Sequence, residues 1–542
     1  MPNWQALSGV GIGNWRINFI PRANWLHLAL LFAVLATPSV YLLLNFPPLW
    51  RDSDGFWQIT GKFNDLTVLH WPPLYCFVAR LPIALGQILA ALVRGQGIPR
   101  ISVMHPVMTD LGLSLLLISQ HALLIATMLF ACVSATKFPI VQVLIAGLFV
   151  LNPALYAFAH SVGSEALSNV FTLLTAILGY RCIVTQTASK GWLGVFFLSL
   201  VVAILTRHVN AILAGLLPVA FLLALLLNTI GNMLRGDRIG SGEVILLHHR
   251  FLTFTLLGVG AIVAANAVTI LACRLTKTPF RSKIGATFEW RLDYLETISP
   301  NSQIEILKAI DHDLNDSAIS YALGKAQALL ATGRPWDPTI IHTALFDWLS
   351  AQGTTGWRTL RFEVDKRLNR IALQFLLTGG TEFWSSVIRN FWTGLNFSSA
   401  DLCREAFRTT DLLVQFSVDN SFRPIRHLAT FQSQEQSYES RWSRNAYLTL
   451  GQPVRLWELM LVALFGAVWS CSLRQKRNPQ LGVYLISLVI TGAAICFANC
   501  ALTFLAPRFT LPLYCLVLVG LAMLLGSLEI RFSGLIRRAT TM

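Results

Sequence analysis

Two carboxylates stand close together shortly after the first long apolar stretch of the chain. Asp52 and Asp54 lie in the segment FPPLWRDSDGFWQITGKF, where aromatic residues crowd them. A carboxylate in a partly dehydrated site has a raised proton affinity, which suits a general base. Asp54 directly precedes a helix expected to begin at Gly55, so it is also a candidate helix cap. Asp52 is the better candidate for the chemistry, and a solvated loop acid is the alternative.

Four cations could serve the same site. Lys62 and His70 belong to the same loop, whereas Arg207 and Arg508 stand at the ends of apolar stretches far along the chain. A phosphate leaving group gains negative charge, so cations aimed at it would accelerate its departure. The planar guanidinium of an arginine suits phosphate better than the point charge of a lysine. Both arginines could instead be anchors at the membrane surface, and His70 could be a packed interfacial histidine.

Glu165 opens another apolar stretch, where it could bind substrate or cap the helix expected to begin near Ser164. Asp52 and Asp54 could share a divalent ion, but this reading is not favoured. The nine cysteines form no CxxC pair and no His/Cys ligand spacing. Patterns of common hydrolases and nucleotide-binding enzymes are also missing. We therefore expect no metal and no other cofactor.

The composition shows what must position these side chains. The chain has 542 residues, of which 54% are hydrophobic and 13% charged, whereas soluble domains carry about 25% charged residues. Apolar runs close to the ~20 residues that cross a bilayer predict an all-α polytopic membrane protein with about ten transmembrane helices. These runs cover residues 25–46, 107–132, 138–160, 163–184, 191–206, 208–230, 251–272, 455–473, 481–503 and 509–529.

The basic residues between these runs predict the orientation. With the amino terminus inside, every cytoplasmic segment is rich in lysine and arginine, as the positive-inside rule requires. Both termini are then cytoplasmic. Segments 47–106 and 273–454 lie outside, and so does the active site.

The two external segments differ in character. In the first, Pro82 and Gly86 interrupt the apolar residues 74–93, so we expect an interfacial or re-entrant helix rather than a span. The second predicts helices at 317–332, 338–352, 360–377 and 381–395, with aromatic residues of the last helix facing the membrane interface: Phe383, Trp384, Phe391 and Trp392. This segment is nearly neutral, so the net charge of +15 belongs to the loops and nucleic acid is not an expected partner.

Five motifs in order resemble the C-type (GT-C) glycosyltransferases, membrane enzymes that take a sugar from a polyprenyl-phosphate carrier. The motifs are RDSDGFW, HWPPLY from His70 to Tyr75, LNPALYAFAHSVGSEALSNVF around Glu165, LTRHVN at Arg207 and APRFTLPLY at Arg508. The order is similar to that of the protein mannosyltransferase and aminoarabinose transferase branches. The chain departs from many relatives in having Trp71 where they have a lysine, which removes one cation from the donor phosphate.

The apolar runs and loops divide the chain into residues 1–272, a core with the first external loop, 273–454, an external domain, and 455–542, the last spans. The resemblance covers about the first 230 residues and the last 40, which makes the core the catalytic part, and it does not cover the external domain. It implies transfer of a sugar from a polyprenyl phosphate to a glycan, lipid or protein acceptor, with inversion, at the outer face of a bacterial inner membrane. Asp52 and Asp54 would be catalytic. The substrate would be bound by Lys62, His70, Tyr75, Glu165, Arg207 and Arg508.

Two other classes of function remain open. A polymerase or ligase of cell-surface glycans would depend on arginines rather than on an acid. A transporter would need paired broken helices and internal symmetry, and neither is evident in the sequence; a scaffold without activity is the last alternative.

Overall fold

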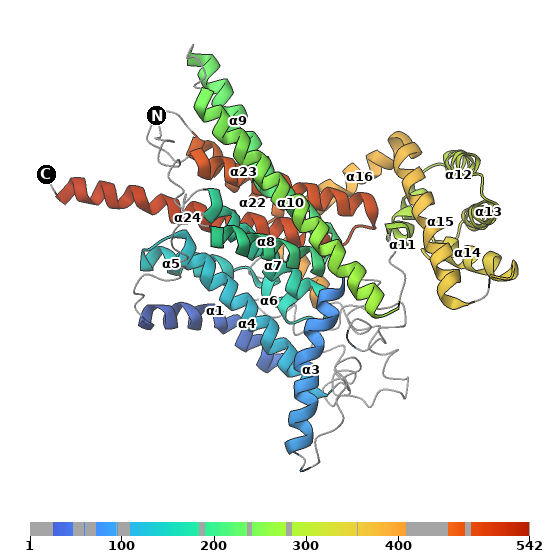
Figure 1. The fold of residues 1–542 in the computed structure, drawn as a ribbon, viewed down its shortest axis with the longest axis horizontal. Coiled ribbons are helices and arrows are strands. Elements are labelled where there is room, and N and C mark those ends of the chain that lie inside the picture. The colour runs from blue at the N-terminus through green and yellow to red at the C-terminus, as the bar shows by residue number, and fades with distance from the viewer. Residues whose placement is uncertain are drawn as a thin grey trace.

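The protein is an all-α, multi-pass membrane protein. The computed structural model describes residues 25–46, 59, 72–93, 95, 109–183, 190–235, 241–277, 284–354, 356–407, 454–471 and 479–540, and these contain no β-sheet. Lipid offers the backbone no hydrogen-bond partners, so a chain that crosses it does so as helices. Figure 1 shows a bundle of long helices with a separate group of shorter helices at one end.

Every apolar run predicted from the sequence is helical in the structure. Among the described residues, eight helices are long and apolar enough to cross a membrane, or nine if a pair bent by 64° counts as one span. Two shorter apolar helices, α8 and α22, join them in the bundle. The bounds are α1 Trp25–Asn45, α4 Asp110–Ala135, α5 Pro139–Val150, α6 Pro153–Ala159, α7 Ser164–Ile183, α8 Lys190–Thr206, η3 His208–Gly215, α9 Leu216–Arg235, α10 Ser241–Leu275, α22 Leu456–Cys471, α23 Pro479–Leu502, η5 Pro507–Thr510 and α24 Leu511–Thr540.

One of the eight helices differs from expectation. Helix α3 runs without a break from Pro73 to Val93, through both Pro82 and Gly86. Proline is tolerated in membrane helices. Gly86 is needed for packing rather than for a turn, because a Cβ there would lie 2.2 Å from the Cα of Gly112 on α4. The predicted interruption is therefore absent, and α3 runs across the direction of α1 and α24 in Figure 1.

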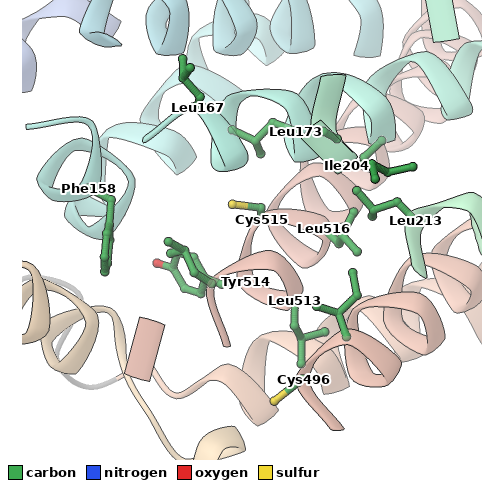
Figure 2. Packing of buried hydrophobic residues seen from close by; sticks show 14 of the residues in the cluster. Phe158, Leu167, Leu173, Ile204, Leu213, Cys496, Leu513, Tyr514, Cys515 and Leu516 are labelled. Carbon is green, nitrogen blue, oxygen red and sulfur yellow. The ribbon is translucent and has the colours of Figure 1, made fainter. Parts of the chain in front are cut away.

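The centre of the bundle is formed by α7, α23 and α24. Their apolar stretches are 83%, 67% and 94% buried, whereas that of α10 is only 28% buried. Figure 2 shows Leu513 and Leu516 of α24 in the same core as Leu173 of α7 and Leu213 of η3. Helix α10 exposes many large apolar side chains, as a surface in contact with lipid requires: Leu252, Leu256, Val259, Val263, Val268 and Leu271.

The shorter helices form a group that we call the helical domain, residues 284–407. Its members are α11 Ile284–Phe288, η4 Glu289–Thr297, α12 Pro300–Leu314, α13 Ser317–Ala331, α14 Ile340–Ala351, α15 Trp357–Thr378, α16 Gly380–Leu395 and α17 Ser399–Phe407. Helices α13 to α16 match the four predicted helices, whereas α12 and α17 were not predicted. In Figure 1 the domain lies at the end of the bundle opposite to the start of α1 and the end of α24.

A buried arginine ties this domain to the bundle. The Nε of Arg291 donates to the carbonyl of Cys500 in α23 at 2.8 Å, and its Nη2 donates to Ser386 of α16 at 2.7 Å. Asp293 lies 3.3 Å from its Nη1, and the ring of Phe383 lies beside the guanidinium. The charge of Arg291 is thus paired and hydrogen-bonded where the domain meets the membrane helices.

Glu289 is a deeply buried carboxylate of the helical domain, at 4% exposure. Its Oε1 accepts from the backbone N–H of His342 at 2.5 Å. Burial raises its pKa to about 8, although the hydrogen bond from His342 opposes the shift. The side chain is therefore largely protonated in the folded domain at neutral pH.

This burial predicts a pH-dependent stability. The folded pKa lies above the unfolded value of 4.5, so the folded state binds the proton more tightly. Stability should be highest below pH 4.5 and fall as the pH rises through 8, by up to about 3–5 kcal/mol. Glu289→Gln should flatten this dependence. The measurement is the urea midpoint of the helical domain in the full chain in detergent, at pH 5 and pH 9.

The matched control is Glu305→Gln, an exposed position of the same domain, which should keep the wild-type pH dependence. A Glu289→Gln variant that loses as much stability at pH 9 as the wild type would contradict the assignment.

Candidate functional site

The predicted site residues divide into two groups. Asp52, Asp54, Lys62 and His70 lie outside the described residues. Tyr75, Glu165, Arg207 and Arg508 are described: Tyr75 lies in the first turn of α3, Glu165 in the first turn of α7, Arg207 directly before η3 and Arg508 in η5. The last residue of the structure before the acidic segment, Phe46, and the next described residue, Ile59, are both buried.

A break between α6 and α7 organises the part of the bundle around Tyr75. Helix α6 ends at Ala159 and α7 begins at Ser164, so the carbonyls in between lack helical partners. The Gln120 amide of α4 donates to the carbonyls of Ala159 and Ser161, at 2.9 and 3.0 Å. Tyr75 of α3, which is fully buried, donates its hydroxyl to the Gln120 oxygen at 3.1 Å. The hydroxyl of Tyr75 thus supports the break.

Two buried histidines connect the same break to the end of α1. The Nε2 of His160 lies 3.1 Å from the carbonyl of Phe46, and its Nδ1 lies 3.2 Å from the Nε2 of His121. A carbonyl only accepts, so His160 must carry its proton on Nε2 and accept at Nδ1. His121 must then donate from Nε2. The Phe46 carbonyl therefore fixes the tautomers of both neutral histidines. Through this contact His160 also holds Phe46, the last described residue before the acidic segment.

A second break, between α8 and η3, places Arg207 beside Glu165. The Asn210 amide donates to the Ser168 hydroxyl of α7 and to the Ala203 carbonyl of α8, both at 2.9 Å. Arg207 precedes η3, and its Nη1 lies 3.3 Å from the Oε1 of Glu165. The two side chains are 19% and 13% exposed. Arg207 is therefore a partner of a carboxylate inside the protein rather than a membrane anchor.

Glu165 belongs to the first turn of α7, where the helix dipole favours a negative charge. Its carboxylate folds back over Gly163, since a Cβ on that glycine would lie 2.8 Å from Oε2. Glu165 therefore lies at a helix end, as one expectation had it, and it also positions the guanidinium of Arg207.

Arg508 brings a second cation to the same place. Its guanidinium carbon lies 4.9 Å from the centroid of the Phe509 ring, and that of Arg207 lies 5.7 Å from the same centroid. The two guanidinium groups are therefore no further apart than the sum of these distances. Arg508 also forms an ion pair with Glu405 of α17, at 3.8 Å. Its side chain is 17% exposed, so it is not a surface anchor either.

Helix α17 is the part of the helical domain that reaches the site. It packs against α6 and η5. The hydroxyl of Tyr514 in α24 donates to the side chain of Asn152, which precedes α6. The described site thus combines membrane helices with one helix of the helical domain.

Several of these residues were missed by the sequence reasoning. Gln120 and His121 interrupt an apolar run, and a polar residue within a span is itself a functional signal. His160 stands inside a quoted motif without having been singled out. Glu405 gave no signal, because a single acid in a mixed-charge segment has no distinctive spacing.

The described arrangement brings two guanidinium groups, each paired with a carboxylate, to one aromatic ring. Within the described ranges no group of three potential metal ligands is found. No protein-family model and no curated protein matches this sequence. Assignment to the C-type glycosyltransferases therefore stays a prediction.

The Arg207–Glu165 pair makes a measurable prediction. In a double-mutant cycle of Arg207→Gln and Glu165→Gln, we expect a coupling energy of about 1–3 kcal/mol, because each single change leaves a poorly solvated charge. The measurement is the thermal unfolding of the four proteins in one detergent. The exposed pair Arg404–Asp401, also 3.3 Å apart, serves as control and should show less than about 1 kcal/mol. Additive effects of Arg207→Gln and Glu165→Gln would contradict a coupled pair.

Proposed function

We propose that this protein is an integral-membrane glycosyltransferase that transfers a sugar from a polyprenyl phosphate to an acceptor hydroxyl or amine. The observation that carries the proposal is the convergence of Arg207 and Arg508 on the Phe509 ring. Two partly buried guanidinium groups from distant parts of the chain would attract a phosphate to this part of the bundle. A lipid-linked phosphate is the anion that such a location would receive.

The arginines would act on the leaving group. A polyprenyl-phosphate sugar is a phosphodiester with one negative charge, and its departure yields a phosphate monoester that approaches two. Cations held beside this group stabilise the later state more than the earlier one, which lowers the barrier. Glu165 and Glu405 hold the guanidinium groups in place, so little reorganisation is needed when the donor binds.

Asp52 would act as the base. Its carboxylate takes the proton from the acceptor, whose oxygen or nitrogen forms a bond to the anomeric carbon. The bond between that carbon and the phosphate oxygen breaks, and polyprenyl phosphate leaves with the electron pair. Attack from the face opposite to the phosphate inverts the anomeric centre. Asp54 would cap the following helix or assist Asp52, and Lys62 and His70 would add contacts to the donor.

The residue that ends the described chain before the acidic segment, Phe46, is held by a hydrogen bond. His160 holds the carbonyl of Phe46 at the end of α1, within the cluster that contains Tyr75 and Gln120. Asp52 follows Phe46 closely in the sequence. This supports a position of the base near the arginines.

We place the reaction on the non-cytoplasmic side of a bacterial plasma membrane, with both chain termini cytoplasmic. The basic loops support this orientation. The acceptor could be a glycan, a lipid or a protein, and no nucleic acid takes part.

A polymerase or ligase of surface glycans that relies on the two arginines is the second candidate, favoured by the same cation pair. A transporter would use the bent pair α5–α6 as a discontinuous span. Neither needs a carboxylate base, which gives a clear test.

The test is release of polyprenyl phosphate and transfer of radiolabelled sugar by the purified full chain, using mannose and aminoarabinose donors. We expect Asp52→Asn to lower turnover by about 10²–10⁴-fold, the usual contribution of a general base. Arg508→Ala should lower it by about 10²–10³-fold, as loss of a charge-stabilising donor does. Controls are Glu305→Gln and Arg334→Ala, both exposed in the helical domain, which should retain full activity.

Each outcome has a defined meaning. Activity that is lost in Arg508→Ala but retained in Asp52→Asn favours the arginine-dependent polymerase or ligase. Donor binding without any turnover in the wild type, measured with both donors and a panel of acceptors, would overturn the transferase and leave the transporter or a scaffold.

A further inference from the structure

Helix α16 carries apolar side chains on two adjoining faces. Phe383, Val387 and Leu395 are buried, at 0%, 0% and 4% exposure. Trp384, Ile388 and Trp392 are 37%, 48% and 60% exposed. These three residues follow one another at intervals of four, so they form one line along the helix. We call them the α16 stripe. Two tryptophans and an isoleucine would be an unfavourable surface in water.

The first turns of α16 lie beside a membrane helix. The ring of Trp384 stacks on that of Phe497 with centroids 6.3 Å apart, and the Phe391 ring meets Phe497 edge-on at 5.8 Å. Phe497 belongs to α23, which ends at Leu502. At ~1.5 Å per residue, Phe497 lies about 7–8 Å before the end of that helix. The stripe therefore starts at a level within α23 rather than beyond it.

The other end of α16 is fixed at the start of another membrane helix. The N–H of Leu456, the first residue of α22, donates to the carbonyl of Phe397 at 3.0 Å. Phe397 is the second residue after the end of α16 at Leu395. From its first turns, α22 exposes apolar side chains of its own, including Trp457 and Leu461 at 37% and 42%. Both ends of α16 thus lie level with the ends of apolar membrane helices.

We propose that α16 is an interfacial helix whose stripe inserts into the boundary between headgroups and acyl chains, in the leaflet on the side of the helical domain. Tryptophan is enriched at this depth because its ring is apolar and its N–H is polar. The polar face of the helix carries Ser385, Arg389 and Thr393, all exposed, as in helices that lie in the plane of a membrane.

A lipid surface fits the stripe better than a protein partner does. The stripe continues from the Trp384–Phe497 stack, and α23 must itself contact lipid where it is exposed, as at Ile490, which is 42% exposed. The sequence reasoning gave all four aromatic residues of α16 to the membrane. The structure divides them: Phe383 enters the core of the helical domain, and Phe391 packs on α23.

Membrane insertion of α16 would also set the position of α17. Only Asn396, Phe397 and Ser398 separate the two helices, and α17 carries Glu405 to Arg508. The depth of α16 in the leaflet would therefore determine where Glu405 meets the cation. The insertion itself does not depend on the proposed transferase activity.

The experiment places an environment-sensitive nitrobenzoxadiazole label at Ile388→Cys in the full chain, reconstituted in phosphatidylcholine nanodiscs. The matched control is Thr393→Cys on the far face of α16. All nine native cysteines are described, eight of them buried and Cys471 half-buried, so wild type and Cys471→Ser supply the labelling background. Thermal unfolding of each labelled protein confirms that it is folded.

We expect the label at 388 to emit at shorter wavelength than the label at 393. Iodide in the water should quench it several-fold less, and lipids with a spin label near the headgroup end of the acyl chain should quench it several-fold more. Equal iodide quenching at both positions would overturn the proposal. Protection at 388 from both iodide and spin-labelled lipid would also overturn it, and would assign the stripe to a second protein surface.

Discussion

The need to satisfy backbone hydrogen bonds inside a membrane governs the functional end of this protein. A helix that stops within the bundle leaves carbonyls without partners, and lipid supplies no donors for them. At the break after α6, the Gln120 amide nitrogen donates to two such carbonyls. The Tyr75 hydroxyl donates to the Gln120 side-chain oxygen. Because these side chains belong to α3 and α4, closing the break also ties α4 to α3, the helix that follows the acidic segment in the sequence.

The same constraint explains where the charges stand. A guanidinium buried near the bilayer is unfavourable unless it is paired. Arg207 and Arg508 each have a carboxylate partner, and both lie against the aromatic ring of Phe509. These partners come from α7 and from the helical domain. Pairing therefore makes two cations tolerable in a partly buried place.

Length and composition were sufficient to predict the architecture. Ten apolar runs are helices, and four helices of the large external segment were found from periodicity. Pro82 and Gly86 look like interruptions in the sequence, but α3 continues through both, and Gly86 faces Gly112 at a contact between helices. The interfacial helix expected here stays a prediction. The geometry of the site was harder to predict from the sequence. Glu165 and Arg207 could be named as candidates, but their pairing depends on how two helix breaks pack, and Glu405 has no local pattern at all.

The helical domain is best understood as part of the site rather than as an appendage. Several of its elements contact the bundle: Arg291 donates to the end of α23, α16 stacks on Phe497, Phe397 accepts from Leu456, and α17 packs against α6 and η5. Contacts through several elements hold the domain in a fixed orientation. A change at any of them would therefore move Glu405 relative to Arg508. Within the described chain, the membrane helices supply both guanidinium groups, but the carboxylate that holds Arg508 comes from outside them.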